Sequence, residues 1–170
     1  YHCPNVHKAF TAGVVSPSSY RIASRGQAIR HSAEAPASTA YALAEGGQPY
    51  EAFFVFPASS IQCYPGEVLN TFRWVPLAVD GTLLIREWWF DADTPTDEQA
   101  EIIDLDWRTT VTEDFDLMDS VQRGMRSRGY TPGPLIERPD GIATVHSEDA
   151  VPHLHDLVRT ALGRRESGRP

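Results

Sequence analysis

The stretch from Pro49 to Phe90 constrains the fold most, because aromatic and β-branched residues crowd it and turn formers divide it. Such residues favour pleated strands. An Asp-Gly pair between two apolar runs favours a tight hairpin, and Asp80-Gly81 provides one. Pro76 cannot donate to a strand ladder, so it marks an edge or a bulge. The sequence predicts an antiparallel meander with strands at 51–56, 61–64, 67–79 and 82–90.

Helical patterns follow the predicted sheet. A helix is expected over 97–105, and another begins where Thr110-x-x-Glu113 could form a capping box. This second helix is expected to end near Arg128, with Gly129 as its cap. Its apolar stripe is expected to face the core and consists of Leu117, Met118, Val121 and Met125. A last helix is expected over 148–162, so the chain reads as an α+β fold with long helices packed on an antiparallel sheet.

The region before the sheet is harder to interpret. Tyr20 to Ile22 is compatible with a short strand, and residues 24–47 are rich in Ala, Ser and Gly and receive no assignment. His31 is interpreted as a surface histidine. Within the last predicted strand, Arg86 and Glu87 are expected to face outward as salt-bridge partners, with binding of a polar substrate group as the alternative.

Length and charge limit the classes of protein. The 170 residues suit one domain, predicted over 1–163 with a disordered tail at 164–170. A net charge of −8 gives no electrostatic case for nucleic acid, and no apolar run suits a membrane span. Two cysteines, Cys3 and Cys63, fit a reducing compartment, so a cytoplasmic protein is expected. Because the chain begins with Tyr1, we expect a fragment of a longer protein.

Two histidines near the start and one distant carboxylate are candidate metal ligands. His2 and His7 flank Pro4, and neutral imidazole is a common ligand of iron, copper and zinc. Asp114 begins the apolar stripe, and a carboxylate aimed at the interior is costly unless it is paired or bound to metal. The alternatives are two solvated histidines and an Asp114 that only complements the helix dipole.

The order of several motifs resembles a known family. Tyr1-His2-Cys3-Pro4-x-x-His7 resembles the iron-binding motif of the large catalytic subunits of Rieske-type non-haem iron oxygenases. Glu113-Asp114 followed by Val121-Gln122-Arg123-Gly124 is similar to the family segment that carries the third iron ligand. Further matches, in chain order, are Phe56-Pro57, Ser127-Arg128-Gly129-Tyr130, Pro132-Gly133-Pro134-Leu135, and Ser147-Glu148 leading to His155.

The resemblance implies a helix-grip (START-like) domain in which His2, His7 and Asp114 hold a mononuclear Fe(II). It also implies a two-iron, two-sulfur cluster in an N-terminal Rieske domain, a reductase or ferredoxin as electron donor, and a homotrimer. The chain contains no Cys-x-His and Cys-x-x-His pair for that cluster. The acidic residue that the family places three positions before the first iron histidine would precede Tyr1. The fragment alone is therefore not expected to support NADH-driven turnover.

The function implied by the resemblance is dioxygen-dependent hydroxylation or oxidative demethylation of a small aromatic or betaine-like substrate. Most of the sheet's aromatic residues are expected to pack in the core, with one or two lining an apolar pocket or caging a quaternary ammonium group. They are Phe53, Phe54, Phe56, Phe72, Trp74, Trp88, Trp89 and Phe90. The alternatives are a non-catalytic helix-grip domain that binds an apolar small molecule, and a zinc hydrolase that uses the same three ligands.

Overall fold

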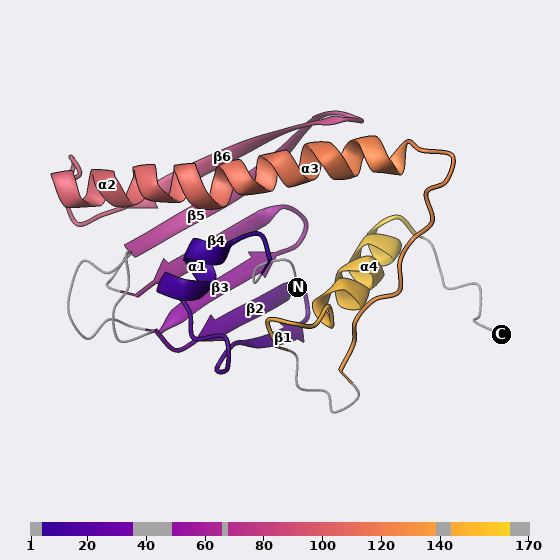
Figure 1. Ribbon diagram of the computed structural model, residues 1–170, viewed down its shortest axis with the longest axis horizontal. Coiled ribbons are helices and arrows are strands. Elements are labelled where there is room, and N and C mark those ends of the chain that lie inside the picture. The colour runs from indigo at the N-terminus through magenta and orange to yellow at the C-terminus, as the bar shows by residue number, and fades with distance from the viewer. Residues whose placement is uncertain (1–4, 36–48, 66–67, 139–143, 164–170) are drawn as a thin grey trace.

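The computed structural model describes residues 5–35, 49–65, 68–138 and 144–163, which form one six-stranded antiparallel sheet with helices on it (Figure 1). Every strand pairs with its neighbour in sequence, in the order β1-β2-β3-β4-β5-β6. This confirms the predicted meander and the α+β class. The strands are β1 Arg21–Arg25, β2 Ala28–Ala33, β3 Tyr50–Val55, β4 Ser59–Tyr64, β5 Val68–Ala78 and β6 Gly81–Trp89.

The long β5–β6 hairpin contributes residues to the lining of the cavity beside the candidate site. Ala78 pairs with Gly81, so the hairpin turn is Val79-Asp80, one residue before the predicted Asp80-Gly81, and the register shifts between Pro76 and Ala78. The prediction of an edge or bulge at Pro76 is therefore resolved as a bulge. Further along the hairpin, Phe72 lies opposite Arg86, so the two side chains share one face of the sheet.

The first hairpin corrects two interpretations. Strand β2 occupies part of the stretch that received no assignment, because Gly26 supplies the left-handed turn (φ 57°) that closes β1 onto β2. His31 is not a surface residue: it lies on β2, and its Nδ1 is 2.9 Å from the Tyr20 hydroxyl. Burial lowers the pKa of His31 to about 4.

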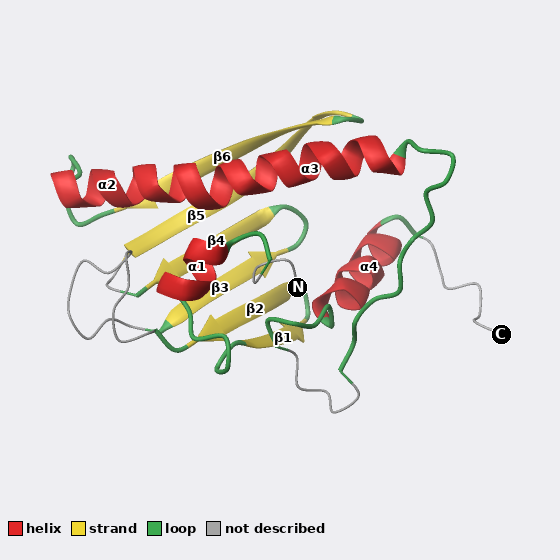
Figure 2. Cartoon of the chain, in the orientation of Figure 1, coloured by secondary structure: helices red, strands yellow, loops and turns green. Residues whose placement is uncertain are grey.

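The helices are α1 Lys8–Gly13, α2 Asp97–Asp106, the π-helical turn η1 Trp107–Val111, α3 Thr112–Met125 and α4 Ala150–Ala161. Helices α2, η1 and α3 form one continuous rod along β5 and β6 (Figure 2). The predicted helix start at Thr110 is therefore wrong. The capping box lies instead at Thr96 and Gln99, where α2 begins. No helix in the described part of the chain is long and apolar enough to cross a membrane.

The expected burial of the α3 stripe is also wrong. Met118, Val121 and Met125 are each about half exposed, and α3 has no buried residue. The physical reason is that α3 does not pack closely on the sheet here, since Leu117 and Met118 line a cavity instead. Helix α3 ends at Met125 with Arg126 as its C-cap, earlier than predicted. The predicted tail, 164–170, lies outside the described residues.

The buried core joins α1 to the sheet and the rod. Phe10 from α1 meets Tyr50 from β3 edge to face, with ring centroids 5.2 Å apart, and Tyr50 meets Tyr64 in the same way at 5.7 Å. Ile102 from α2 belongs to the same cluster. This packing fixes the start of α1 against the middle of the rod, and that is where the candidate site lies.

Candidate metal centre

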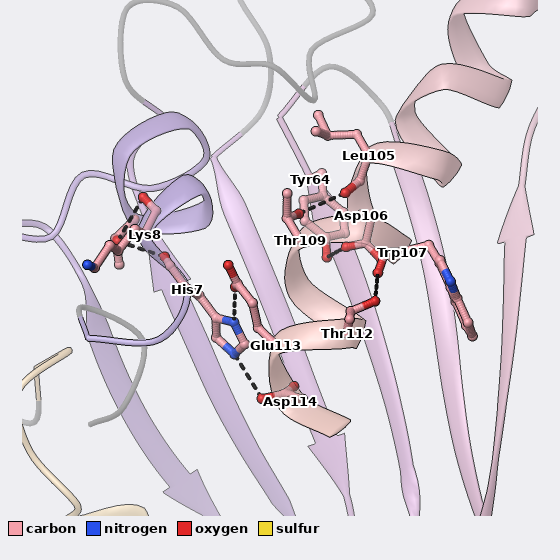
Figure 3. A network of polar contacts seen from close by, with 11 residues as sticks. His7, Lys8, Tyr64, Leu105, Asp106, Trp107, Thr109, Thr112, Glu113 and Asp114 are labelled. Atoms are coloured by element: carbon pink, nitrogen blue, oxygen red, sulfur yellow. Dashed lines mark hydrogen bonds and ion pairs between the residues drawn. The ribbon is translucent and has the colours of Figure 1, made fainter. Parts of the chain in front are cut away.

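His7 is the N-cap residue of α1 and is buried, with 4% of its surface exposed. Its carbonyl oxygen accepts hydrogen bonds from the backbone N–H of Thr11 at 3.0 Å and from the Thr11 hydroxyl at 2.8 Å. These contacts and the neighbouring Phe10 fix the backbone from which the imidazole projects. The ring points away from α1, toward the first turn of α3 (Figure 3).

Both ring nitrogens of His7 face carboxylates on α3. Nδ1 lies 3.0 Å from Glu113 Oε2, and Nε2 lies 3.0 Å from Asp114 Oδ1 (Figure 3). The acidic side chains are about one third exposed, at 34% for Glu113 and 39% for Asp114. The structure thus brings together two of the three predicted ligands, from segments more than a hundred residues apart. The third, His2, lies outside the described residues.

Glu113 is a site residue that the sequence reasoning missed. The sequence offered only its position next to Asp114 as an indication, and Glu113 was assigned to a capping box instead. The structure shows instead that two successive carboxylates straddle one imidazole. A carboxylate on the second ring nitrogen is the usual partner of a metal-binding histidine, because it fixes the tautomer and the orientation of the ring.

The electrostatics of this contact favour positive charge on His7. Burial by itself lowers the pKa of the imidazole, but the hydrogen bonds to Asp114 and Glu113 outweigh burial and leave the pKa above its ordinary value. The same carboxylates would stabilise a cation bound at Nε2 in place of the proton.

The donor set fits a metal ion in part. Ligands at about 2.0–2.2 Å from a shared ion lie roughly 3–4 Å from one another, and His7 Nε2 and Asp114 Oδ1 are 3.0 Å apart. Imidazole and carboxylate are also the ligand types of the two-histidine, one-carboxylate iron site. Among the described residues, no cluster of three His, Cys, Asp or Glu side chains is placed to hold a metal ion. Any third ligand would come from outside the described residues, where the predicted His2 lies.

A cavity of about 380 Å³ opens beside His7 and Asp114. Its walls come from α1, the sheet and the rod, and they are rich in aromatic rings. The aromatic residues that line it are Phe10, Tyr20, Tyr50, Tyr64, Phe72, Trp74 and Phe115. Two of the sheet aromatics singled out from the sequence, Phe72 and Trp74, are among them, and their rings stack 5.7 Å apart. A larger hollow of about 870 Å³ between β6 and the rod touches neither His7 nor Asp114.

Arg86 corrects another expectation. It does not face outward: its side chain is 9% exposed and pairs with the fully buried Asp106. The guanidinium carbon lies 4.2 Å from the centre of the Phe72 ring. The sequence could not show this, because the partner carboxylate lies on α2, the element that follows β6. Glu87 remains within reach of Thr71 on β5, with 3.5 Å between Oε2 and Oγ1.

Comparison with known proteins identifies the family. Residues 1–164 match the model of the ring hydroxylating alpha subunit (catalytic domain). The carnitine monooxygenase oxygenase subunit of Escherichia coli (strain K12) is 26% identical over 162 residues, which is 93% of this chain and 42% of that protein. The corresponding Acinetobacter baumannii subunit is 23% identical over 133 residues, 76% of this chain and 36% of that protein.

Solved structures agree on the fold. The crystal structure of a quaternary ammonium Rieske monooxygenase superposes with a TM-score of 0.84 at 22% identity, over 94% of this chain and 43% of that chain. A structure of such an enzyme with L-carnitine gives 0.79 at 22% identity, over 94% of this chain and 42% of that chain. The chain thus spans less than half the length of these relatives. It belongs to the family of ring hydroxylating alpha subunits, and the match lies in their catalytic domain.

Proposed function

We propose that this chain is the catalytic domain of an oxygenase that holds a mononuclear Fe(II) with His2, His7 and Asp114. It hydroxylates or oxidatively demethylates a betaine-like substrate. The observation that carries the proposal is the convergence of His7 and Asp114, at 3.0 Å, on the edge of an aromatic cavity. Family membership supports it, since the family implies non-haem iron catalysis and a two-iron, two-sulfur domain.

The proposal gives each side chain at the site a role. Glu113 accepts a hydrogen bond from His7 Nδ1–H, which leaves the Nε2 lone pair free to bind metal. Asp114 supplies an anionic oxygen beside that nitrogen. Iron bound there would activate dioxygen for attack on a carbon atom of the substrate. The rings around the cavity exclude water from the reacting carbon and hold the substrate against the ligands.

A cationic, methylated substrate suits the cavity. Aromatic faces attract quaternary ammonium groups, and seven aromatic side chains line this space. No lysine or arginine is among its described lining residues, and the Asp114 carboxylate is one of them. The related enzymes are named for carnitine and for quaternary ammonium compounds, which supports the same class here. Hydroxylation of an N-methyl carbon would release that carbon and leave the demethylated amine.

The proposal extends to the rest of the protein. Residues 1–163 would form the oxygenase domain, and electrons would arrive from a Rieske cluster that a reductase or ferredoxin reduces. A homotrimer in the cytoplasm would let one subunit's cluster serve a neighbour's iron. One structural relative is described in terms of inter-subunit electron transfer, which supports such an assembly.

The test compares two carboxylates two residues apart on α3. In full-length protein, Asp114→Ala should abolish mononuclear iron binding and leave the Rieske cluster's visible absorption intact. Asp116→Ala should keep iron at the wild-type level, because Asp116 is exposed and has no contact with His7. Equal iron loss in both variants would contradict the proposed ligand set. Product formation from a betaine-like amine that continues without dioxygen would contradict the oxygenase and favour a zinc hydrolase.

A further inference from the structure

The rod contains a π-helical turn, η1, between α2 and α3. Ile102, Asp106 and Val111 are buried, and Asp114 contacts His7, so the residues that face the sheet are spaced by four, five and three. Spacings of three and four are those of an α-helical face. The spacing of five falls on η1, Trp107–Val111.

The turn changes the direction in which α3 presents its carboxylates. In an unbroken α-helix, Asp106 and Asp114 would point about 80° apart, because each residue rotates the chain by about 100°. One extra residue absorbed in a π turn reduces this difference to about 20°. Asp106 and Asp114 therefore lie on the same side of the rod only because η1 separates them. Without the turn, α3 would be rotated by about 100°, so Asp114 would point away from His7 and Glu113 would take the direction that Asp114 has now.

A buried ion pair holds the rod at the start of this turn. Asp106, the N-cap residue of η1, is fully buried and pairs with Arg86 Nη1. The Tyr64 hydroxyl lies 3.4 Å from the other carboxylate oxygen. The guanidinium stacks on Phe72 at 4.2 Å, which ties the pair to β5 as well as β6. The beginning of η1 is thus fixed to three neighbouring strands.

Threonine hydroxyls hold the turn from within (Figure 3). The Thr112 hydroxyl donates to the carbonyl oxygen of Trp107 at 2.8 Å, and the Thr112 backbone N–H donates to the same oxygen. This i to i−5 contact is the π-helical bond itself, doubled by a side chain. The Thr109 hydroxyl donates to the carbonyl oxygen of Leu105 at 2.8 Å. Local bonds and the buried pair therefore favour the same irregular turn.

The Arg86–Asp106 ion pair is not expected to add much to the free energy of unfolding, because part of the guanidinium is left without partners. Arg86 Nε and Nη2 are buried and make no hydrogen bond. A buried pair with unmet donors contributes little net stability and is better explained by the arrangement it specifies. We propose that Arg86 and Asp106 are positioning residues for the metal site: they anchor η1 in the register that turns Glu113 and Asp114 toward His7. This inference rests on the proposed function, because it assigns the pair a purpose at that site.

The test replaces the pair by apolar residues of similar size in full-length protein. The double variant Arg86→Met, Asp106→Leu should fold, with circular dichroism and a Tm at or above those of the wild type. Its affinity for Co(II), used as the metal probe, should fall at least about tenfold, the scale of losing support for a ligand. The matched control is Arg159→Met, Asp156→Leu, an exposed ion pair on α4 that should leave affinity unchanged. A folded double variant with wild-type affinity would overturn the inference.

Two further measurements keep the outcome decisive. The ¹⁵N signals of the His7 imidazole in metal-free protein report the Asp114 contact directly, and they should change in the double variant but not in the control. If the wild type binds no Co(II), the proposed function fails, and these signals alone decide the positioning role. If the double variant does not fold, Thr112→Val becomes the test. Its affinity should be about two- to tenfold weaker, and an unchanged affinity in folded protein would refute the role of η1.

Discussion

Replacement of Glu113 isolates the part that the second carboxylate plays at His7. Glu113→Ala removes the acceptor 3.0 Å from Nδ1 and leaves Asp114 in place. The His7 side chain is 5% exposed, so the orientation of its ring depends on the groups that contact it. We expect the ring to lose its fixed orientation and the metal site to weaken.

The structure sets the size of the effect. An unmet buried donor costs about 1–3 kcal/mol, which corresponds to roughly five- to 150-fold in affinity. Because the Glu113 side chain is 34% exposed, water can enter the vacated space and the lower part of that range applies. We therefore expect Glu113→Ala to bind Co(II) about tenfold more weakly. Glu113→Gln keeps an acceptor oxygen but loses the charge, so about threefold is expected.

The assay is calorimetric or spectroscopic titration of metal-free protein with Co(II) at constant pH. Asp116→Ala is the matched control, since it removes one exposed negative charge from the same helix. A Glu113→Ala protein that binds Co(II) within twofold of the wild type would refute the reasoning. An equal loss in Asp116→Ala would show that net charge, not contact with His7, controls affinity.

Three further predictions concern stability, substrate and turnover. His31 has an ordinary pKa of 6.5 when unfolded and about 4 when folded, so the folded state binds its proton less well. Its contribution to stability is complete above pH 6.5 and is lost as pH falls toward 4. It amounts to roughly 3 kcal/mol at about 1.4 kcal/mol per pKa unit. Urea unfolding at several pH values should show this loss in the wild type and not in His31→Gln, and identical profiles would count against it. Trp74→Leu should bind tetramethylammonium several-fold more weakly in equilibrium dialysis, and unchanged binding would place the cation elsewhere. Residues 1–170 alone, loaded with Fe(II), should not couple NADH oxidation to product formation with any added reductase, and sustained turnover in an oxygen electrode would contradict this.

The elements that sequence patterns predicted well are those set by local chemistry. The β5–β6 hairpin turns at Val79-Asp80, one residue before the expected Asp80-Gly81, and the register shift lies between Pro76 and Ala78. The helix predicted over 97–105 is α2, with one residue more at its end. In each case a turn former or a capping residue acts on its immediate neighbours, so the sequence carries the information in one place.

The failures have a common physical cause in contacts between distant segments. The pattern Thr110-x-x-Glu113 suggested a capping box and therefore a helix start. Instead, packing against the sheet and side-chain bonds carry the helix through this segment as a π turn. Arg86 was expected to face outward. No pattern near it could indicate its buried partner, because Asp106 lies on a different element, α2. The contact of His7 with Asp114 followed only from the resemblance, since no local pattern joins residues so far apart.

The strand order has a consequence for how the site assembles. All five strand pairings join sequence neighbours, and all connections but the one between β2 and β3 are two or three residues long, so most of the sheet can grow by short loop closures that are fast. The His7–Glu113 contact spans 106 residues and belongs to the slow, long-range class. We expect α1 to dock on the rod after the meander has formed, so the ligands meet in the final folding step. Metal binding would then stabilise only the fully folded state, and variants that loosen α1 would lose metal before they lose the sheet.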